Sequence, residues 1–359
     1  MIRTYLNILY IFSLMLLLGI SFSLPVKAQE QSDTIVRASR IERVREKRIL
    51  VQSKVDRILD KHQRITTDTL YISRPEQPLT IRVKTDIYSN SMRFHSRHDD
   101  NTTATYEIKS ALKETIGFSA NYRGISLSLS LNPKHILGKN SDIEYQLNFY
   151  RNSFGADITY SYLHSFKGKD NIGIYNGWYD LPNTLHEGLS INGYWVFNRR
   201  RFSYPAVFSH SWIQRRSAGS FLVGASGYIG ALDLGDFYDD IPQMHGRELN
   251  RITMSHISVG AGYGYNLVTP NRKMLIHLSA MPTMIVWKNY KLHYNDGNEN
   301  MTTDPLGMFM VARGGFTYSW KKYFAGANGV LNFSLIGLET DVSHFNEKLN
   351  IRFYIGIRI

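Results

Sequence analysis

The chain has no cysteine among its 359 residues. This absence excludes disulfide bonds, thiolate metal sites and a lipid-modified N-terminal cysteine, so the mature chain is not expected to be a lipoprotein. Beyond residue 28 no apolar run approaches about 18 residues, so no membrane-spanning helix is expected there. Proline is scarce, with 10 residues, whereas Tyr (23), Phe (18) and Gly (27) are plentiful. This composition favours many strands over helices.

The first 28 residues have the pattern of an export signal. Arg3 precedes the apolar stretch "YLNILYIFSLMLLLGISFSL", and small or neutral residues surround Val26 and Ala28. We expect a secretory signal peptide over residues 1–28 that is cleaved after Ala28. The alternative is an uncleaved anchor, because the apolar stretch is about long enough to span a bilayer.

Residues 33–64 carry apolar side chains at three-, four- and seven-residue steps, which predicts an amphipathic helix. The rest of this segment holds ten Lys or Arg and five Asp or Glu, a net charge of +5. A linker with Pro75 and Pro78 follows, so 29–78 is predicted to be a periplasmic helix and linker. Two hypotheses stand for the helix: it plugs the lumen of a barrel, or it binds a periplasmic protein partner.

Alternation of apolar and polar residues dominates from Leu79 to the end of the chain. It is regular in "GISLSLSLN", over residues 124–132, and in the final "LNIRFYIGIRI". Such alternation indicates strands with one apolar and one polar face. No helical period of useful length interrupts it, so residues 79–359 are predicted to form one all-β domain.

A soluble barrel would bury the apolar faces, whereas a membrane barrel turns them outward to lipid. Two features favour the membrane barrel. Long connections alternate with short turns, the long ones being 231–252, 288–306 and 338–347. Aromatic residues also gather near strand ends, as in the girdles at headgroup level. These aromatic residues are Tyr145, Tyr160, Tyr162, Trp195, Tyr263, Tyr265 and Trp320.

The alternation of connection lengths holds throughout if two segments each form one long strand. These segments are 105–122 and 188–213, the second bent near "NRRRFSYP". The count is then about 12 strands, within a range of roughly 10 to 14, with both termini on the periplasmic side. The expected fold class is an all-β, transmembrane, antiparallel up-and-down β-barrel preceded by an N-terminal amphipathic helix.

The chain ends on its last strand without a polar tail. Pairing of this strand with the first one would close the barrel and leave no free edge. The terminal alternation also resembles the C-terminal signal read by the outer-membrane assembly machinery, which is therefore an expected partner. The charged residues expected to face the lumen are Asp142, Glu144, Asp157, Arg352 and Arg358.

The stretch "YWVFNRRRFSYPAVFSHSWIQRRSAGSFLVG" resembles the most recognisable block of an uncharacterised Bacteroidota family, domain of unknown function 4421. That family reads roughly as Tyr-Val-Phe-Asn, Lys-Phe-Ser-Tyr and Gln-Lys-Lys-Ser-Ala-Gly-Ser-Phe, matched here by 195–198, 201–204 and 214–221. The resemblance covers 68–359 and implies an outer-membrane barrel, with no activity assigned. The motif residues expected to have a structural role are Phe197, Asn198, Phe202, Ser203, Tyr204, Gln214, Ser217, Gly219 and Ser220.

No pattern in the sequence predicts a catalytic or metal site. Ser209, His210 and Ser211 lie in "FSHSWI", and His277 and Ser279 lie in "MLIHLSAM". A catalytic pair needs a nucleophile and a base within hydrogen-bond reach, and neighbours along a strand point to opposite faces. His210 and Ser211 are therefore not expected to pair. The 12 His show no HxH or HExxH spacing, so no metal or other cofactor is expected.

The net charge of +12 includes the basic runs "NRRRF" and "IQRRS". These runs could bind anionic lipopolysaccharide or phospholipid headgroups, or they could be ordinary interface Arg that extend toward headgroups. Outer-membrane lipid and lipopolysaccharide are expected partners, whereas nucleic acid is not, because the chain is exported. We expect a porin-like protein of the cell outer membrane: a small channel, a transport-associated protein or a structural envelope protein. The alternative is a lipid-modifying barrel enzyme of the phospholipase or lipid A deacylase type.

Overall fold

The computed structural model describes residues 67–97, 103–122, 125–131, 133, 142–164, 166–170, 177–235, 249–300, 307–337 and 342–359. These belong to one compact unit that spans Ile65–Ile359. The predicted signal peptide over 1–28 and the predicted helix over 33–64 lie outside the described residues and stay predictions. In the part of the chain that is described, no helix is long and apolar enough to cross a membrane.

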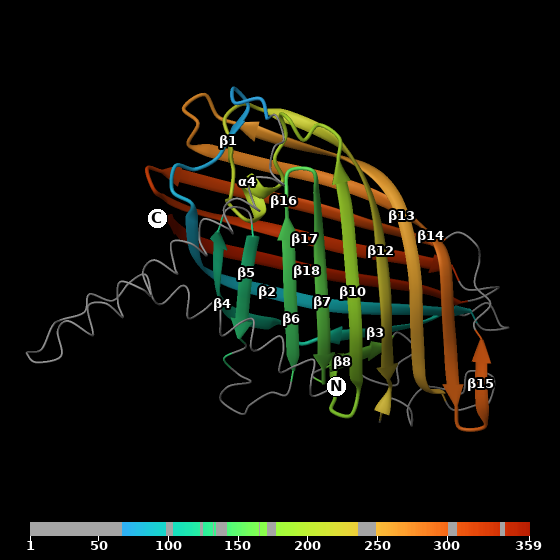
Figure 1. Ribbon diagram of the computed structural model, residues 1–359. Helices are drawn as coiled ribbons and strands as arrows, with labels where there is room; N and C mark the ends of the chain where they lie inside the picture. The colour runs from blue at the N-terminus through green and yellow to red at the C-terminus, as the bar shows by residue number, and fades with distance from the viewer. Residues whose placement is uncertain are drawn as a thin grey trace, which may run out of the picture. The chain divides into compact units, whose positions relative to one another are not determined.

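Twelve strands of the main sheet follow one another in a continuous antiparallel path (Figure 1). Along the chain these strands are β2 (Leu79–Arg97), β4 (Lys113–Tyr122), β5 (Ile125–Leu131), β6 (Ile143–Tyr150), β7 (Phe154–Leu163), β10 (Leu185–Val196), β12 (Ala218–Asp233), β13 (Leu249–Val268), β14 (Met274–Tyr294), β16 (Met308–Trp320), β17 (Tyr323–Gly337) and β18 (Val342–Arg358). The shorter strands β3 (Thr103–Ser110), β8 (Phe166–Asp170), β9 (Tyr179–Leu181) and β15 (Gly297–Asn300) extend this sheet.

The sheet curls round until its two end strands, β5 and β6, lie next to each other (Figure 1). The last strand, β18, pairs with β2 over its whole length. At its end Leu79 and Ile359 exchange backbone hydrogen bonds of 3.0 and 2.8 Å. The predicted pairing of the last strand with the first is therefore confirmed, as is the antiparallel all-β fold.

The two faces of the sheet differ in chemistry, as the alternation predicts. On β18, Phe353 and Ile355 are 51% and 56% exposed on the outer face, whereas Arg352 and Tyr354 are buried on the inner face. Successive residues of a strand point to opposite sides, so one slip in register would reverse the arrangement. The outer face of the barrel is thus largely apolar and the inner face largely polar.

Exposed aromatic rings lie on the outer face near the short connections. Phe154 stacks on Trp195 with ring centroids 6.3 Å apart, and Phe221 contacts Tyr263 edge to face at 5.3 Å. Trp320 lies 6.1 Å from Tyr323 across the tight turn between β16 and β17. Such rings at strand ends are the arrangement found in the girdles of membrane barrels.

Two predicted strands are wrong in detail. The segment 188–213 is not one bent strand, because β10 ends at Val196 and only Ile213–Gln214 (β11) is again extended. Pro205 lacks an N–H for a sheet ladder and begins the short helix α4 (Pro205–Phe208) instead. The segment 105–122 is divided at positions 111–112 into β3, which pairs with β8, and β4, which pairs with β5.

Candidate functional site in the barrel lumen

The connection between β10 and β12, residues 197–217, folds into the barrel and is called the lumenal segment below. Phe202, Val207 and His210 are 0% exposed, and Phe208 is 2% exposed. The apolar side chains of Phe202, Val207 and Phe208 pack against inward-facing residues of several strands, with which they form one buried cluster. This connection therefore fills one end of the lumen rather than extending a strand wall.

The residues of the family motif hold the lumenal segment in place. The Gln214 carboxamide oxygen accepts hydrogen bonds from the Ser203 backbone N–H at 3.0 Å and from Asn266 Nδ2 at 2.9 Å. Its Nε2 donates to the Arg201 carbonyl at 2.6 Å. Asn198 Nδ2 donates to the Gly219 carbonyl at 2.8 Å. A buried backbone that lies outside a ladder needs such partners, so the motif supplies the hydrogen bonds that an inward loop would lack.

Further motif residues complete this framework. The Asn198 backbone N–H donates to Ser220 Oγ at 2.9 Å, and the Val268 N–H donates to Ser217 Oγ at 2.9 Å. Phe202 and Tyr204 point inward and are buried, whereas Phe197 is 60% exposed on the outer face. All nine motif residues thus lie in the lumenal segment or where it joins β12.

Residues 68–73 precede the first barrel strand and bind the lumenal segment, although they are not part of the main sheet. β1 (Ile72–Ser73) pairs with β11 as a separate two-stranded sheet. The Arg215 N–H donates to the Tyr71 carbonyl at 2.7 Å, and Asp68 pairs with Arg201 at 3.1 Å. Part of the predicted linker therefore belongs structurally to the lumenal segment.

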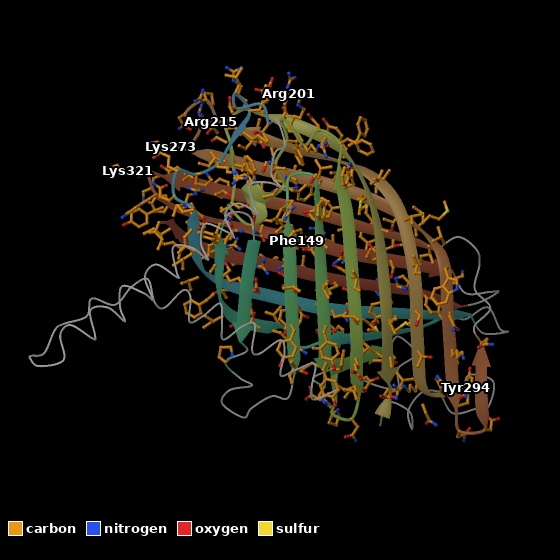
Figure 2. The ribbon with its side chains drawn as sticks, in the orientation of Figure 1. Phe149, Arg201, Arg215, Lys273, Tyr294 and Lys321 are labelled. Atoms are coloured by element: carbon orange, nitrogen blue, oxygen red, sulfur yellow. The ribbon has the colours of Figure 1, made fainter. Side chains whose placement is uncertain are left out.

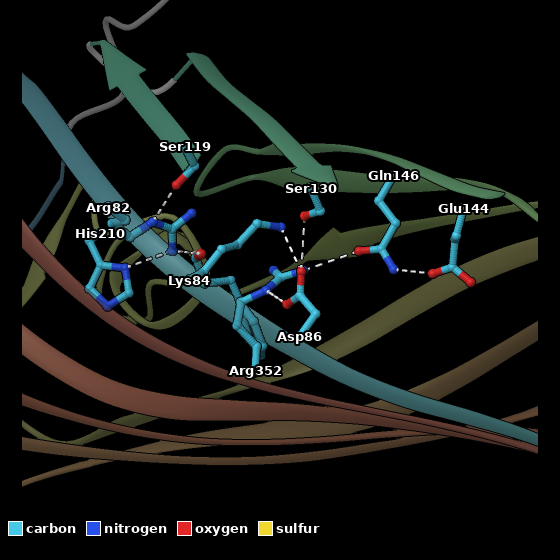
Figure 3. A network of polar contacts seen from close by, with 10 residues as sticks. Arg82, Lys84, Asp86, Ser119, Ser130, Glu144, Gln146, His210 and Arg352 are labelled. Carbon is cyan, nitrogen blue, oxygen red and sulfur yellow. Dashed lines mark hydrogen bonds and ion pairs between the residues drawn. The ribbon is translucent and has the colours of Figure 1, made fainter. Parts of the chain in front are cut away.

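His210 joins the lumenal segment to the barrel wall (Figure 3). Its ring stacks on Phe324 at 4.3 Å, and Arg82 Nη1 donates to its Nδ1 at 3.2 Å and to the Phe208 carbonyl at 2.6 Å. Burial, with Arg82 and Arg358 nearby, lowers the pKa of His210 well below its ordinary value. The ring is therefore neutral, which leaves Nδ1 free to accept from the always charged arginine.

Next to His210 lies a layer of buried ion pairs (Figure 3). Asp86 pairs with Lys84 at 2.9 Å and also with Arg352. Arg352 continues to Gln146 at 3.1 Å. From Gln146 the network runs to Glu144 at 2.5 Å, and Glu144 pairs with Lys348 at 3.2 Å.

Two further ion pairs lie on the inner face of the barrel. Arg313 pairs with Asp157 at 2.7 Å and lies 5.3 Å over the Tyr194 ring. Lys113 pairs with Asp142 at 2.8 Å. These ion pairs and the lumenal segment lie together inside the barrel.

All five charged residues that the sequence places in the lumen lie on the inner face. Asp142, Glu144, Asp157 and Arg352 each belong to an ion pair, and Arg358 lies 4.7 Å over the Phe324 ring. Other inward-facing charged residues of these networks are absent from the sequence prediction. The same alternation could have found them, because they occupy inward positions of alternating strands. These missed residues are Arg82, Lys84, Asp86, Lys113 and Arg313.

The serine and histidine candidates lie inside the barrel. His277 Nε2 is 3.0 Å from Ser279 Oγ, and its Nδ1 is 2.7 Å from Asn266 Oδ1. Ser279 is also bonded to the Tyr204 hydroxyl at 2.6 Å, and the fully buried His277 ring packs against Tyr204 at 4.9 Å. This geometry supports the lumenal segment and gives a lipid substrate no access. Within the described ranges, no group of His, Asp and Glu could hold a metal ion.

Beyond the charged layer the lumen holds a cavity of about 80 Å³. Its walls come from eight strands and are mostly amides, hydroxyls and imidazoles. The lining residues are Asn90, Thr159, Ser161, His186, Gly188, Ser190, Asn192, Ser226, Gly227, Tyr228, His256, Phe309, Asn332, Ser334 and Lys348.

Basic side chains gather at the end of the barrel that carries the lumenal segment. Figure 2 shows Arg201, Arg215, Lys273 and Lys321 at this end and Tyr294 at the other. All four cations lie on the short connections or on the lumenal segment. This end of the barrel is therefore a positively charged rim.

The described residues thus define an antiparallel β-barrel with an apolar outer face and a lumen that holds the lumenal segment and buried ion pairs. The chain belongs to the family described as Domain of unknown function (DUF4421), which matches residues 66–358. A search of curated protein sequences gave no match.

Three solved structures are similar to this chain in fold. The outer membrane protease OmpT from Escherichia coli is 8% identical, with 79% of this chain and 97% of that chain covered and a TM-score of 0.37. The translocator domain of the autotransporter NalP from Neisseria meningitidis is 10% identical, with 92% and 100% covered and a TM-score of 0.33. The toluene transporter TodX from P. putida is 9% identical, with 79% and 91% covered and a TM-score of 0.26. At such low TM-scores these likenesses support no conclusion about activity.

Proposed function

We propose that this protein is an outer-membrane β-barrel that works as a gated small channel, held closed by the lumenal segment. The observation that carries the proposal is the burial of the lumenal segment inside the barrel, where Phe202, Val207 and His210 are fully enclosed. A barrel of about 12 strands would otherwise leave a narrow lumen. On this proposal, the described arrangement is the closed state of the channel.

The outer face supports a place in a lipid bilayer. On β14 the outward side chains are apolar from Ile276 to Trp287 and become polar at Asn289. At about 3.3 Å per residue and a strand tilt near 40°, this stretch rises roughly 25–30 Å. That height is close to the apolar band of membrane barrels, which is about 25 Å.

The proposed orientation follows from the connections. Short turns and the C-terminus share the end that carries the lumenal segment, and this end would face the periplasm. The charged rim would then lie at the headgroups of the inner leaflet, where phospholipid is the expected partner. Export by the signal peptide and insertion by the assembly machinery belong to the same proposal, as does a periplasmic partner for residues 33–64.

The buried charges favour a gate over a purely structural barrel. Removing paired charges from water is costly, and apolar side chains of similar volume would often fill a lumen as stably. The charged layer around Asp86 and Arg352 is therefore a poor choice for stability alone. Charges that pair in the closed state can instead line a water-filled path once the lumenal segment moves.

Single-channel recordings in planar bilayers test the proposal. The mature chain is compared with a variant in which residues 202–211 are replaced by a flexible Gly-Ser stretch of equal length. We expect little steady conductance from the mature chain and a stable conductance from the variant. A milder variant, Val207→Asp, introduces a buried charge and should raise the open probability if the full replacement does not fold. A large steady conductance from the unmodified chain would refute the closed-state proposal, as would silent recordings from both variants.

No observation favours the lipid-modifying enzyme. A barrel enzyme of that type uses a Ser and a His on its outer wall, whereas His210 and His277 are both 0% exposed inside the lumen. The proposal therefore leaves this alternative aside.

A further inference from the structure

The cavity beyond the charged layer is built from neighbouring positions on the inner face. Asn90, Lys348 and Asn332 are register partners on the adjacent strands β2, β18 and β17. On the opposite wall Ser226 of β12 is the register partner of Asn192 of β10. The strand ladders thus fix the spacing of these side chains, and the cavity walls do not depend on a loop.

Several polar atoms of this wall have no hydrogen-bond partner among the described residues. They are Asn90 Oδ1, His186 Nδ1, Ser226 Oγ and Asn332 Oδ1. Asn90, His186 and Ser226 are 8%, 3% and 4% exposed, so bulk water does not fully satisfy their hydrogen bonds. A buried polar atom without a partner costs about 1–3 kcal/mol, and it gains that amount when a bound molecule supplies the partner.

One side of the cavity is aromatic. The rings of Tyr228 and His256 stack with centroids 5.4 Å apart, and Phe309 lies 6.4 Å from His256. Tyr228 is fixed by a 2.8 Å hydrogen bond between its hydroxyl and His186 Nε2. Together these rings give an aromatic wall beside a polar one.

The electrostatic balance of the cavity is close to neutral. Lys348 is the one Lys or Arg in its lining, and its ammonium pairs with Glu144 at 3.2 Å. An anionic ligand would compete with Glu144, and a cationic one would meet the Lys348 charge. A neutral ligand with several hydroxyl groups is compatible with both.

We propose that this cavity binds one small neutral polyhydroxylated molecule, of the size and chemistry of a hexose. Hydroxyl groups both donate and accept, as the unpaired amide, imidazole and hydroxyl atoms require. The C–H face of a sugar ring packs on aromatic rings such as Tyr228. An enclosed water needs roughly 10–15 Å³, so 80 Å³ holds about five to eight waters or one hexose in their place.

This inference rests on the proposed channel function and adds the class of ligand that the lumen binds. It requires the lumen to be closed beyond the cavity. Binding is measured on the full mature chain in detergent micelles by ligand-observed saturation-transfer NMR and calorimetry. The probes are D-glucose, D-galactose and N-acetyl-D-glucosamine, with inorganic phosphate as the anionic probe. Binding in micelles does not require conduction, so failure here is distinguishable from failure of the channel proposal.

Matched variants of β17 locate the site. Asn332→Leu removes a cavity amide, whereas Asn328→Leu removes a buried amide on the same face of the same strand but outside the cavity lining. The first change should weaken binding of a hexose probe at least tenfold and the second should leave it within about twofold. Ser226→Ala and Ser258→Ala form a milder pair, because both serines are buried and only Ser226 lines the cavity.

Saturable binding of a hexose probe that both cavity variants weaken would support the proposal. It would be overturned if none of the hexoses binds, which would mean that water alone fills the cavity. Equal binding by Asn332→Leu and Asn328→Leu would also overturn it. Displacement of the hexose by phosphate would assign the cavity to an anion and reject the neutral class.

Discussion

Lys84 and Asp86 lie two residues apart on β2, so both side chains point into the lumen, and their charged ends meet at 2.9 Å. Arg352 reaches Asp86 from the neighbouring strand β18, where it is the register partner of that residue. One carboxylate thus neutralises two cations at a site that is almost closed to solvent. The order of charges along β2 and β18 determines this arrangement.

Removal of this carboxylate is predicted to be severe. Asp86→Ala leaves Lys84 and Arg352 as buried cations without their partner, and such a change costs about 3–5 kcal/mol. The free energy of unfolding, measured by denaturant titration of barrels refolded in vesicles, should fall by that amount. Asp180→Ala is the control. Asp180 forms an exposed ion pair with Lys167, so this substitution should change the free energy of unfolding very little. Equal stability of the two variants would contradict the buried network.

At the scale of elements, the strands were predictable and the lumenal segment was not. Alternation identifies β18 residue by residue, because a strand between lipid and a polar lumen must alternate. The sequence predicts one bent strand over 188–213, because that reading keeps long and short connections alternating. Nothing local to Phe202 or Phe208 says that these rings pack inward, since the partners that bury them come from distant strands.

The candidate site was also predictable only in part. Inward charges such as Asp157 and Arg352 follow from the alternation, but their pairing depends on which strands face one another across the lumen. Arg313, the partner of Asp157, lies more than 150 positions away in the sequence. The family motif indicated that Gln214 matters for structure, and the hydrogen bonds of Gln214 supply the physical reason.

The lumenal segment should loosen when its central amide is removed. Gln214→Ala leaves the Ser203 N–H and the Arg201 carbonyl without partners, at a cost of about 1–3 kcal/mol. The open form of the segment should then be roughly five- to hundredfold more populated. Limited trypsin digestion in micelles measures this as faster cleavage at Arg199–Arg201 and Arg215–Arg216. Gln77→Ala, which lies outside the segment, should cleave as the unmodified chain does. Identical rates for all three would show that Gln214 does not hold the lumenal segment in place.

For the whole molecule, the proposed place in a membrane depends on an apolar exterior that faces lipid. Leu278 is 68% exposed on the outer face of β14, and Phe221 is 69% exposed on β12. Large apolar side chains exposed all round a barrel would aggregate in water, whereas lipid satisfies them. The last strand, β18, pairs with β17 on one side and β2 on the other, so it leaves no free edge.

An outward charge tests this exterior. Leu278→Arg places a cation in the apolar band and should reduce the free energy of unfolding in vesicles by about 2–4 kcal/mol. Asn289→Arg makes the same kind of change on the same strand but beyond the band, where the cost is close to zero. If both variants unfold like the unmodified protein, this face does not contact lipid.

The most direct test of the central claim is a disulfide between the lumenal segment and the barrel wall. A Cβ atom added at Gly315 on β16 would touch the Val207 side chain of α4, so Val207→Cys with Gly315→Cys brings two thiols together inside the lumen. The chain has no cysteine of its own, so any cross-link comes from this pair. Rapid cross-linking in the membrane is expected for this pair. No cross-link is expected when Val207→Cys is combined with Phe353→Cys, because Phe353 lies on the outer face. Absence of the first cross-link, or equal cross-linking of both pairs, would show that the segment does not occupy the lumen.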